Sequence, residues 1–205
     1  MLKVVKFGGS SLASAEQFRK VAEIVRAEGD RRYVVPSAPG KRHKGDTKVT
    51  DMLYACYEMA SRGEDITECF GEIEARYNGI ISGLSMEFSL EDEYVSIKNA
   101  FIHKAGRDFA ASRGEYLNGR ILAKYLGYDF IDAAEVIFFN DNGQFDSERT
   151  NAVLSAELKK HERAVIPGFY GSMPNDTIKT FSRGGSDITG SIVARAAGCD
   201  LYENW

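Results

Sequence analysis

Lys6 ends an apolar run and is followed by the glycine pair Gly8-Gly9, two serines and a helical pattern. Glycines let a backbone approach a ligand without a clash from Cβ, and the free N–H groups at the start of a helix attract anions. A lysine in this place offsets phosphate charge as a point cation. Residues 6–11 therefore predict a phosphate-binding loop, although a strand-to-helix turn with a solvated lysine gives the same pattern. The segment matches neither GxxxxGK[ST] nor GxGxxG, which excludes the usual P-loop and dinucleotide fingerprints.

A second glycine pair lies between Arg183 and a helical pattern that begins with Ser186 and Asp187. An arginine binds a carboxylate through two parallel hydrogen bonds, which suits Arg183 to an acidic ligand. Asp187 falls in the first helical turn, where a negative charge is favoured. The alternative is purely structural: Ser186 or Asp187 caps the helix, and Arg183 is a surface residue.

Two further segments carry polar groups that could line a binding site. Glu115 follows Gly114 inside a helical pattern, where a glycine costs about 1 kcal/mol relative to alanine and often marks a close approach of the backbone. Its carboxylate is suited to accept hydrogen bonds from an ammonium group, unless it lies on an exposed helix face. Ser37, in a Pro-Ser-Ala loop, and Thr50, at the start of a helical pattern, offer hydroxyl groups, but Thr50 is equally typical of a helix N-cap.

Alternating strand and helix patterns position these residues. The apolar run at 2–7, the helical pattern at 15–28, which opens with the form of a capping box, and the strand pattern at 32–36 predict a βαβ unit. Such units form parallel sheets, so the predicted fold class is α/β, a three-layer αβα sandwich with a mostly parallel central sheet. Further helices are expected at 49–62, 65–84, 90–103, 109–126, 147–160 and 186–197. Further strands are expected at 128–131, 136–139, 164–167, 177–181 and 200–202.

Composition narrows the class of protein. The chain has 205 residues, of which 43% are hydrophobic and 27% charged, and its formal net charge of -4 disfavours a nucleic-acid binder. Cys56, Cys69 and Cys199 show no CxxC spacing, which disfavours a metal site or a disulfide framework and fits reduced cytoplasmic thiols. The first residues lack a signal-peptide core, and no stretch approaches the roughly 18 apolar residues of a membrane span. The basic loop at 41–48 is interpreted as solvated, with attraction of an anionic substrate as the alternative.

The four motifs, in this order, resemble those of the aspartokinases within the amino acid kinase superfamily. The sequence has KFGG at 6–9, Ser37 in its Pro-Ser-Ala loop, SRGE at 112–115 and RGGSD at 183–187, with GFYG at 168–171 before the last. The resemblance covers essentially the whole chain. It implies ATP-dependent phosphorylation of the side-chain carboxylate of L-aspartate to 4-phospho-L-aspartate, the first step towards lysine, threonine and methionine.

The resemblance implies a role for each matching residue. Lys6 would neutralise charge on the transferring phosphoryl group, and Asp187 would orient this lysine. Phosphoryl transfer depends mainly on positioning and charge stabilisation, so no protein nucleophile is needed. Mg²⁺ would bridge the phosphates through phosphate oxygens and water, with no protein metal ligands assigned. Contacts to the phosphates of ATP are implied for Lys6, Gly8, Gly9 and Ser10.

Contacts to L-aspartate are implied in the same way. Arg183 would bind its α-carboxylate and Glu115 its α-ammonium group. The remaining substrate contacts are implied for Ser37, Thr50 and Ser186. Three positions depart mildly from the family pattern: Ser10, Ser182 and Asn118 stand where Thr, Gly and Ser are common.

The resemblance also sets expectations for the parent protein. In the family, the nucleotide pocket is closed by a segment soon after the position of Trp205, and regulatory ACT domains follow. Residues 1–205 are therefore expected to be one catalytic domain, truncated before the adenine-binding segment and holding the aspartate half-site and phosphate loop. The parent is expected to be a cytoplasmic homo-oligomer without nucleic-acid or membrane partners.

Two alternatives to this assignment stay open. A glutamate 5-kinase or acetylglutamate kinase type of enzyme is one, since aspartate and glutamate differ by a methylene worth about 1–3 kcal/mol in a pocket. A non-catalytic binding fragment is the other.

Overall fold

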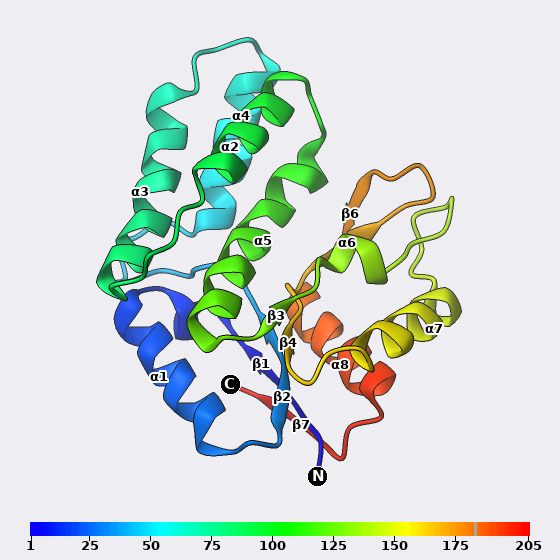
Figure 1. Cartoon of the computed structure of the whole chain (residues 1–205). Coiled ribbons are helices and arrows are strands. Elements are labelled where there is room, and N and C mark those ends of the chain that lie inside the picture. Colours follow the sequence, from blue (N-terminus) through cyan, green and yellow to red (C-terminus); the bar gives the residue numbers. More distant parts are fainter. Residues whose placement is uncertain (183) are drawn as a thin grey trace.

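The computed structural model describes residues 1–182 and 184–205 and has a five-stranded sheet at its centre (Figure 1). The strand order is β3-β4-β2-β1-β7, and every pairing is parallel. All five residues of β1 are buried, as expected for a strand of a parallel sheet that is covered on both faces. The strands are β1 (Lys3–Phe7), β2 (Arg31–Pro36), β3 (Asp129–Phe130), β4 (Ala164–Val165) and β7 (Leu201–Asn204).

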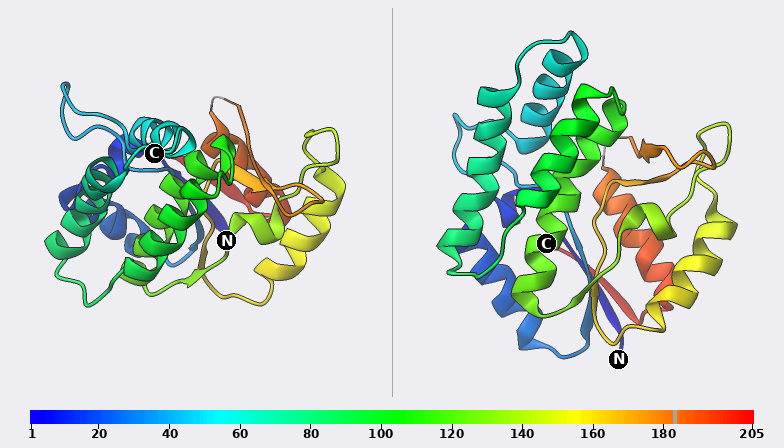
Figure 2. Two further views of the ribbon diagram at one scale, coloured as in Figure 1. Left: turned by 90° about the horizontal axis from the view of Figure 1, so that it is seen from above. Right: turned by 45° about the horizontal axis from the view of Figure 1, so that its top comes forward.

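Helices cover both faces of the sheet, which confirms the predicted three-layer sandwich (Figures 1 and 2). Successive side chains of β1 point to opposite faces, so Val5 belongs to one apolar cluster and Val4 to the other. The first cluster joins the sheet to α1 (Ala15–Ala27), α2 (Val49–Ser61), α3 (Thr67–Gly83), α4 (Glu91–Ile102) and α5 (Arg107–Leu126). The second joins it to α6 (Ala133–Val136), α7 (Ser147–Leu158) and α8 (Gly185–Ala197).

The first βαβ unit forms as the sequence predicts. Ser14 is the N-cap of α1, and its hydroxyl accepts a hydrogen bond from the Gln17 N–H at 3.4 Å. The predicted apolar positions Phe18, Val21, Ala22 and Val25 are all buried. Burial of this helical stripe against the sheet stabilises α1 and fixes the turn that precedes it.

Helix α5 passes unusually close to the loops at the edge of the sheet. A Cβ on Gly114 would lie 2.9 Å from the Cβ of Ala38, and one on Gly119 would lie 3.0 Å from Cγ of Pro167. Both glycines are therefore required by close packing, and the interpretation of Gly114 as a point of close backbone approach is confirmed. The helix ends at Gly127, which adopts a left-handed conformation.

The strand expected at 136–139 is wrong. Residue 136 ends α6, whose first turn is capped by the Asp132 carboxylate, which accepts from the Ala134 N–H at 3.0 Å. Phe138 and Phe139 make only isolated bridges, and the Phe138 N–H donates to Thr150 Oγ1 at 2.9 Å. A side-chain cap and a hydroxyl thus satisfy backbone groups that a strand would have paired.

Besides α6, two elements were not predicted. Residues Gly9–Leu12 form a short 3₁₀ helix, η1, directly after β1. Strand β5 (Tyr170–Ser172) pairs in antiparallel fashion with β6 (Ile178–Thr180), which falls within the strand expected at 177–181. The resulting hairpin is separate from the main sheet and packs against α5.

Candidate active site

A cleft of about 520 Å³ lies at the carboxyl ends of β1 and β2, the edge where ligands bind in open α/β sheets. Its walls come from the loops after these strands and from the first turns of α2 and α8. The cleft brings together most of the residues singled out in the sequence: Lys6, Gly8, Gly9, Ser37, Thr50, Glu115, Ser186 and Asp187. Segments far apart in the chain therefore form one polar site.

Lys6 and Asp187 form an ion pair in this cleft. The Lys6 Nζ lies 2.7 Å from Asp187 Oδ1, which also accepts from Asn204 Nδ2 at 3.3 Å. The lysine side chain is 11% exposed, whereas the aspartate side chain is 52% exposed. The carboxylate thus fixes a largely buried ammonium group at the end of β1 while itself facing solvent.

Gly9, the second glycine after Lys6, is required by packing rather than by backbone conformation. A Cβ on Gly9 would lie 2.9 Å from Ala38 O and 3.2 Å from Gly40 N. The Gly9 carbonyl accepts a hydrogen bond from the Gly40 N–H at 2.8 Å, and the Gly8 N–H donates to Trp205 O at 2.9 Å. The loop after β1 is therefore held against the loop after β2.

Glu115 is a buried carboxyl group that forms no ion pair with the described residues. The residue is 6% exposed, and its Oε2 atom has no hydrogen-bond partner in the described part of the chain. Burial raises its pKa from 4.5 to about 8, while the Ala38 N–H and the Arg113 charge lower it in part. Such a group in a cleft wall is suited to bind an ammonium ion, which would supply the missing partner.

The loop that carries Ser37 is tied to α5 beside Glu115. The Asn118 side-chain amide donates to Ser37 O at 2.7 Å, and Asn118 Oδ1 is buried without a partner among the described residues. Ser37 N–H donates to Phe7 O at 3.0 Å and continues the pairing of β1 with β2. These bonds place Ser37 and Glu115 on the same side of the cleft.

The structural alternatives for Thr50, Ser186 and Asp187 as helix caps are wrong. The N-cap of α2 is Lys48, and that of α8 is Gly184, whose φ is 77°. Neither N-cap makes a side-chain capping bond, so the hydroxyls of Thr50 and Ser186 are not used in this way.

Two predicted ligand-binding residues are not placed in the cleft. Ser10 lies in η1 and is exposed, outside the cleft lining. Arg183 lies outside the described residues, so its predicted contact to a carboxylate stays a prediction.

Several lining residues were missed. Asp51 follows Thr50, and its place at the start of a helix beside the site was the available signal. Lys48 also lines the cleft and belongs to the basic loop for which attraction of an anionic substrate was the alternative. Phe169 also lines the cleft and has a φ of 83°, which is a strained conformation for a bulky residue. Its N–H donates to Thr189 Oγ1 at 3.0 Å, which couples the segment after β4 to α8.

Within residues 1–182 and 184–205, no cluster of three or more His, Cys, Asp or Glu side chains is placed to hold a metal ion. The described helices include none that is both long and apolar enough to cross a membrane.

The fold is a parallel α/β sandwich, and at its cleft the Lys6-Gly8-Gly9 loop faces the glycine-capped start of α8. These features indicate which family the chain belongs to. The chain belongs to the amino acid kinase family, whose sequence profile matches residues 1–205. It is 37% identical to aspartokinase 3 of Bacillus subtilis over 219 residues, covering 100% of this chain and 48% of that protein. It is 28% identical to the chloroplastic aspartokinase 1 of Arabidopsis thaliana, covering 98% and 39%.

Solved structures agree with this assignment. The crystal structure of Clostridium acetobutylicum aspartate kinase has a TM-score of 0.97 and 48% sequence identity, covering 100% of this chain and 47% of that one. Escherichia coli aspartokinase III in complex with aspartate and ADP shares the fold, with a TM-score of 0.81 and 23% identity. The predicted resemblance to aspartokinases is confirmed, and the chain spans about half the length of the relatives it matches.

Proposed function

We propose that this chain is the catalytic part of an aspartokinase, which transfers the γ-phosphoryl group of ATP to the side-chain carboxylate of L-aspartate. The observation that carries the proposal is that one cleft holds a cationic group and, apart from it, a buried carboxyl group. Lys6 offers a cation at the proposed phosphate loop, whereas Glu115 is a buried carboxyl group whose Oε2 atom has no partner among the described residues. An amino acid phosphorylated on its side chain needs both groups: an acceptor for its ammonium and a cation for the phosphoryl group.

The substrate contacts follow from these two groups. The α-ammonium group of L-aspartate would bind Glu115, and the side-chain carboxylate would then extend towards Lys6. The hydroxyls of Ser37 and Thr50 would hold that carboxylate. The roles of Arg183 at the α-carboxylate and of Ser186 beside it remain part of the proposal.

The reaction needs only positioned charges. A carboxylate oxygen of L-aspartate attacks the γ-phosphorus, the bond to the β,γ-bridging oxygen breaks, and ADP leaves with that oxygen. Lys6, held by Asp187, neutralises charge on the transferring group, and Gly8 and Gly9 let the phosphates come close to the backbone. Mg²⁺, when bound, supplies further charge neutralisation on the phosphate oxygens.

The remaining expectations about the whole protein belong to the same proposal. Residues 1–205 would be the catalytic domain, with the rest of the adenine site and the regulatory domains supplied by further sequence. A cytoplasmic location and a homo-oligomeric parent also remain predictions.

Trapping of the acyl phosphate tests the activity. Hydroxylamine converts an acyl phosphate to a hydroxamate. The full-length protein, with the further sequence that would complete the adenine site, is therefore incubated with Mg-ATP, hydroxylamine and one of L-aspartate, L-glutamate or N-acetyl-L-glutamate. We expect hydroxamate with L-aspartate only. Lys6→Ala should lower the rate by about 10²-fold or more, because a preorganised cation is lost. The matched control Lys20→Ala, on the exposed face of α1, should retain it. Product from L-glutamate in place of L-aspartate would contradict the assignment.

A further inference from the structure

The loop at residues 40–48 connects the two sides of the cleft. It begins just after Ser37 and ends at Lys48 and Thr50, which line the cleft at the start of α2. At its start, the Gly40 N–H donates to Gly9 O at 2.8 Å. A Cβ on Gly40 would lie 2.7 Å from Gly9 C, so the two backbones are in direct contact. The position of Gly40 therefore fixes the position of the phosphate loop.

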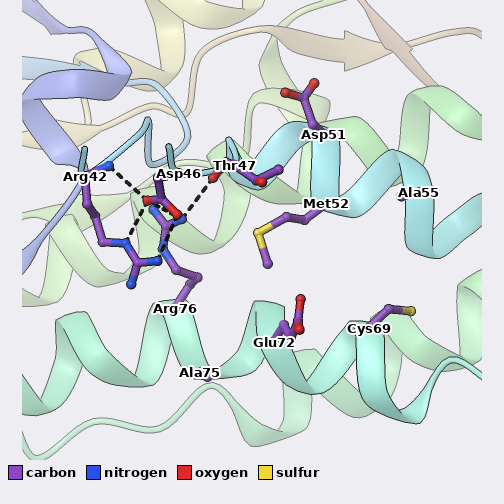
Figure 3. A pocket seen from close by; sticks show the side chains of 10 residues that line it. All are labelled: Arg42, Asp46, Thr47, Asp51, Met52, Ala55, Cys69, Glu72, Ala75 and Arg76. Carbon is purple, nitrogen blue, oxygen red and sulfur yellow. Dashed lines mark hydrogen bonds and ion pairs between the residues drawn. The ribbon is translucent and has the colours of Figure 1, made fainter. Parts of the chain in front are cut away.

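Arg76, on α3, holds this loop at both ends, and Figure 3 shows its contacts with Asp46 and Thr47. Its Nη2 donates to Gly40 O at 2.9 Å, and its Nη1 donates to Thr47 O at 3.1 Å. Nη1 also lies 3.3 Å from Asp46 Oδ2. The arginine side chain is only 5% exposed, so it is a buried charge directed at backbone carbonyls some 30 residues earlier in the chain.

A second arginine closes the loop on itself. Arg42 donates to Asp46 through Nε at 2.7 Å and through Nη2 at 2.9 Å. The Arg42 guanidinium, with that of Arg76, holds the pKa of Asp46 well below its usual range. Burial and the charge of Arg42 lower the pKa of Arg76. Two cations thus share one carboxylate, and Arg76 stays in place through its bonds to the two carbonyls.

The cavity beside these residues does not offer a simpler explanation for Arg76. It has a volume of about 530 Å³ and lies between α2 and α3, with Met52 and Glu72 directed into it from opposite sides (Figure 3). The Nη atoms of Arg76 are already bonded to the 40–48 loop, and its Nε is buried without a partner among the described residues. The donors of Arg76 are therefore directed at the chain itself.

We propose that Arg76 is a positioning residue for the cleft. It acts through Gly40 on Gly9 of the phosphate loop and through Thr47 on the start of α2, where Thr50 faces the substrate. The identity of the substrate in this inference rests on the proposed function. The contacts of Arg76 with Gly40 and Thr47 are independent of that function. Loss of Arg76 would release both ends of the loop at once, which would loosen the phosphate side and the amino-acid side of the cleft together.

The test compares Arg76→Gln and Arg76→Lys with the control Arg42→Gln. Arg42 shares the same carboxylate but is half exposed and bonds to neither Gly40 nor Thr47. Hydrogen exchange of the Gly40 amide, which reports its bond to Gly9, is measured by NMR without ligand. Calorimetric affinity for L-aspartate is measured on the same folded samples, with exchange of the buried Val34 amide as the control for global stability.

We expect Arg76→Gln to speed Gly40 exchange about tenfold or more and to weaken L-aspartate binding about 10–100-fold, because small misplacements of binding groups carry costs of this size. Exchange at Val34 should change much less. Arg76→Lys keeps the charge but replaces the planar fork, whose two nitrogens reach the two carbonyls separately, with one ammonium nitrogen. It should therefore behave like Arg76→Gln, and it serves as the second variant if the glutamine protein does not fold. Arg42→Gln should stay within about threefold of the wild type on both measures.

Wild-type exchange and affinity in the Arg76 variants, or equal effects from Arg42→Gln, would overturn the proposal. If the wild type does not bind L-aspartate, the proposed function fails, while Gly40 exchange still decides whether Arg76 positions the loop.

Discussion

Replacing Glu115 with glutamine should change how the stability of the protein depends on pH. In the folded chain this carboxyl group is 6% exposed, its Oε2 atom has no partner in the described residues, and burial raises its pKa from 4.5 to about 8. The folded protein therefore keeps a proton on Glu115 at a pH where the unfolded chain has released it. Glutamine has nearly the same shape and never ionises, so it removes this one difference.

The sign and size of the effect follow from proton linkage. Because the folded pKa is raised, the contribution of Glu115 to stability is fully present below pH 4.5 and is lost as the pH rises through 8. Each pKa unit corresponds to about 1.36 kcal/mol, so the gap between the two values amounts to about 3–5 kcal/mol. The free energy of unfolding of the wild type should fall by this amount relative to Glu115→Gln between about pH 4.5 and about pH 9.

Urea unfolding of both proteins at intervals across this pH range provides the assay, since each curve gives a free energy of unfolding in water. A matched control is Glu16→Gln on the exposed surface of α1. The hydrogen bond from Lys20 lowers the pKa of Glu16, so its contribution is present above pH 4.5 and is lost as the pH falls, the opposite direction. If the difference between wild type and Glu115→Gln stayed constant over the whole range, the account of Glu115 as a buried, protonated carboxyl would be refuted.

Three further predictions concern other parts of the molecule. Gly40→Ala would force a Cβ to within 2.7 Å of backbone and should cost about 1–3 kcal/mol. Gly45→Ala, whose Cβ would meet only a side chain at 3.7 Å, should change stability by less than about 0.5 kcal/mol; equal melting temperatures for the two variants would contradict the packing argument. The hydrogen bond with the Asp129 carboxylate raises the pKa of His161. The wild type should therefore be more stable than His161→Gln below pH 6.5, and this difference should vanish as the pH rises through the raised pKa. Thermal melts of both proteins across this range test the argument, and a difference that grows with pH would contradict it. Burial raises the pKa of the Cys56 thiol, so iodoacetamide should alkylate Cys56 last of the three cysteines, and its modification before the others by mass spectrometry would count against this packing.

The sequence was most informative where a local pattern decides the structure. Helix α1 has an N-cap at Ser14 and an apolar stripe that includes Phe18 and Val25, and both features act within a few turns of the chain. Gly114 could also be singled out from the sequence, because a glycine destabilises the interior of a helix and often marks a close approach of the backbone. In the structure that close approach is its contact with Ala38. Such features depend on neighbours in sequence or on residue type alone.

The features that were missed depend on contacts between distant segments. Arg76 is one arginine on a helix, and nothing near it in the sequence indicates that it bonds to Gly40 and Thr47. The error at 136–139 has the same origin, since Thr150 from α7 takes the hydrogen bond that a strand neighbour would have made with Phe138. Thr50 matched the composition of an N-cap, but the helix begins one residue earlier, at Val49, and Lys48 is its N-cap.

Calorimetric titration of the chain with L-aspartate tests the central claim most directly. Parallel titrations use L-glutamate, the variant Glu115→Gln, and the control Glu72→Gln, which lies in the other cavity on α3. The account predicts saturable binding of L-aspartate but not of L-glutamate, lost in Glu115→Gln and retained in Glu72→Gln. Binding of L-aspartate to Glu115→Gln as tight as to the wild type would contradict the assignment of this cleft as an aspartate site.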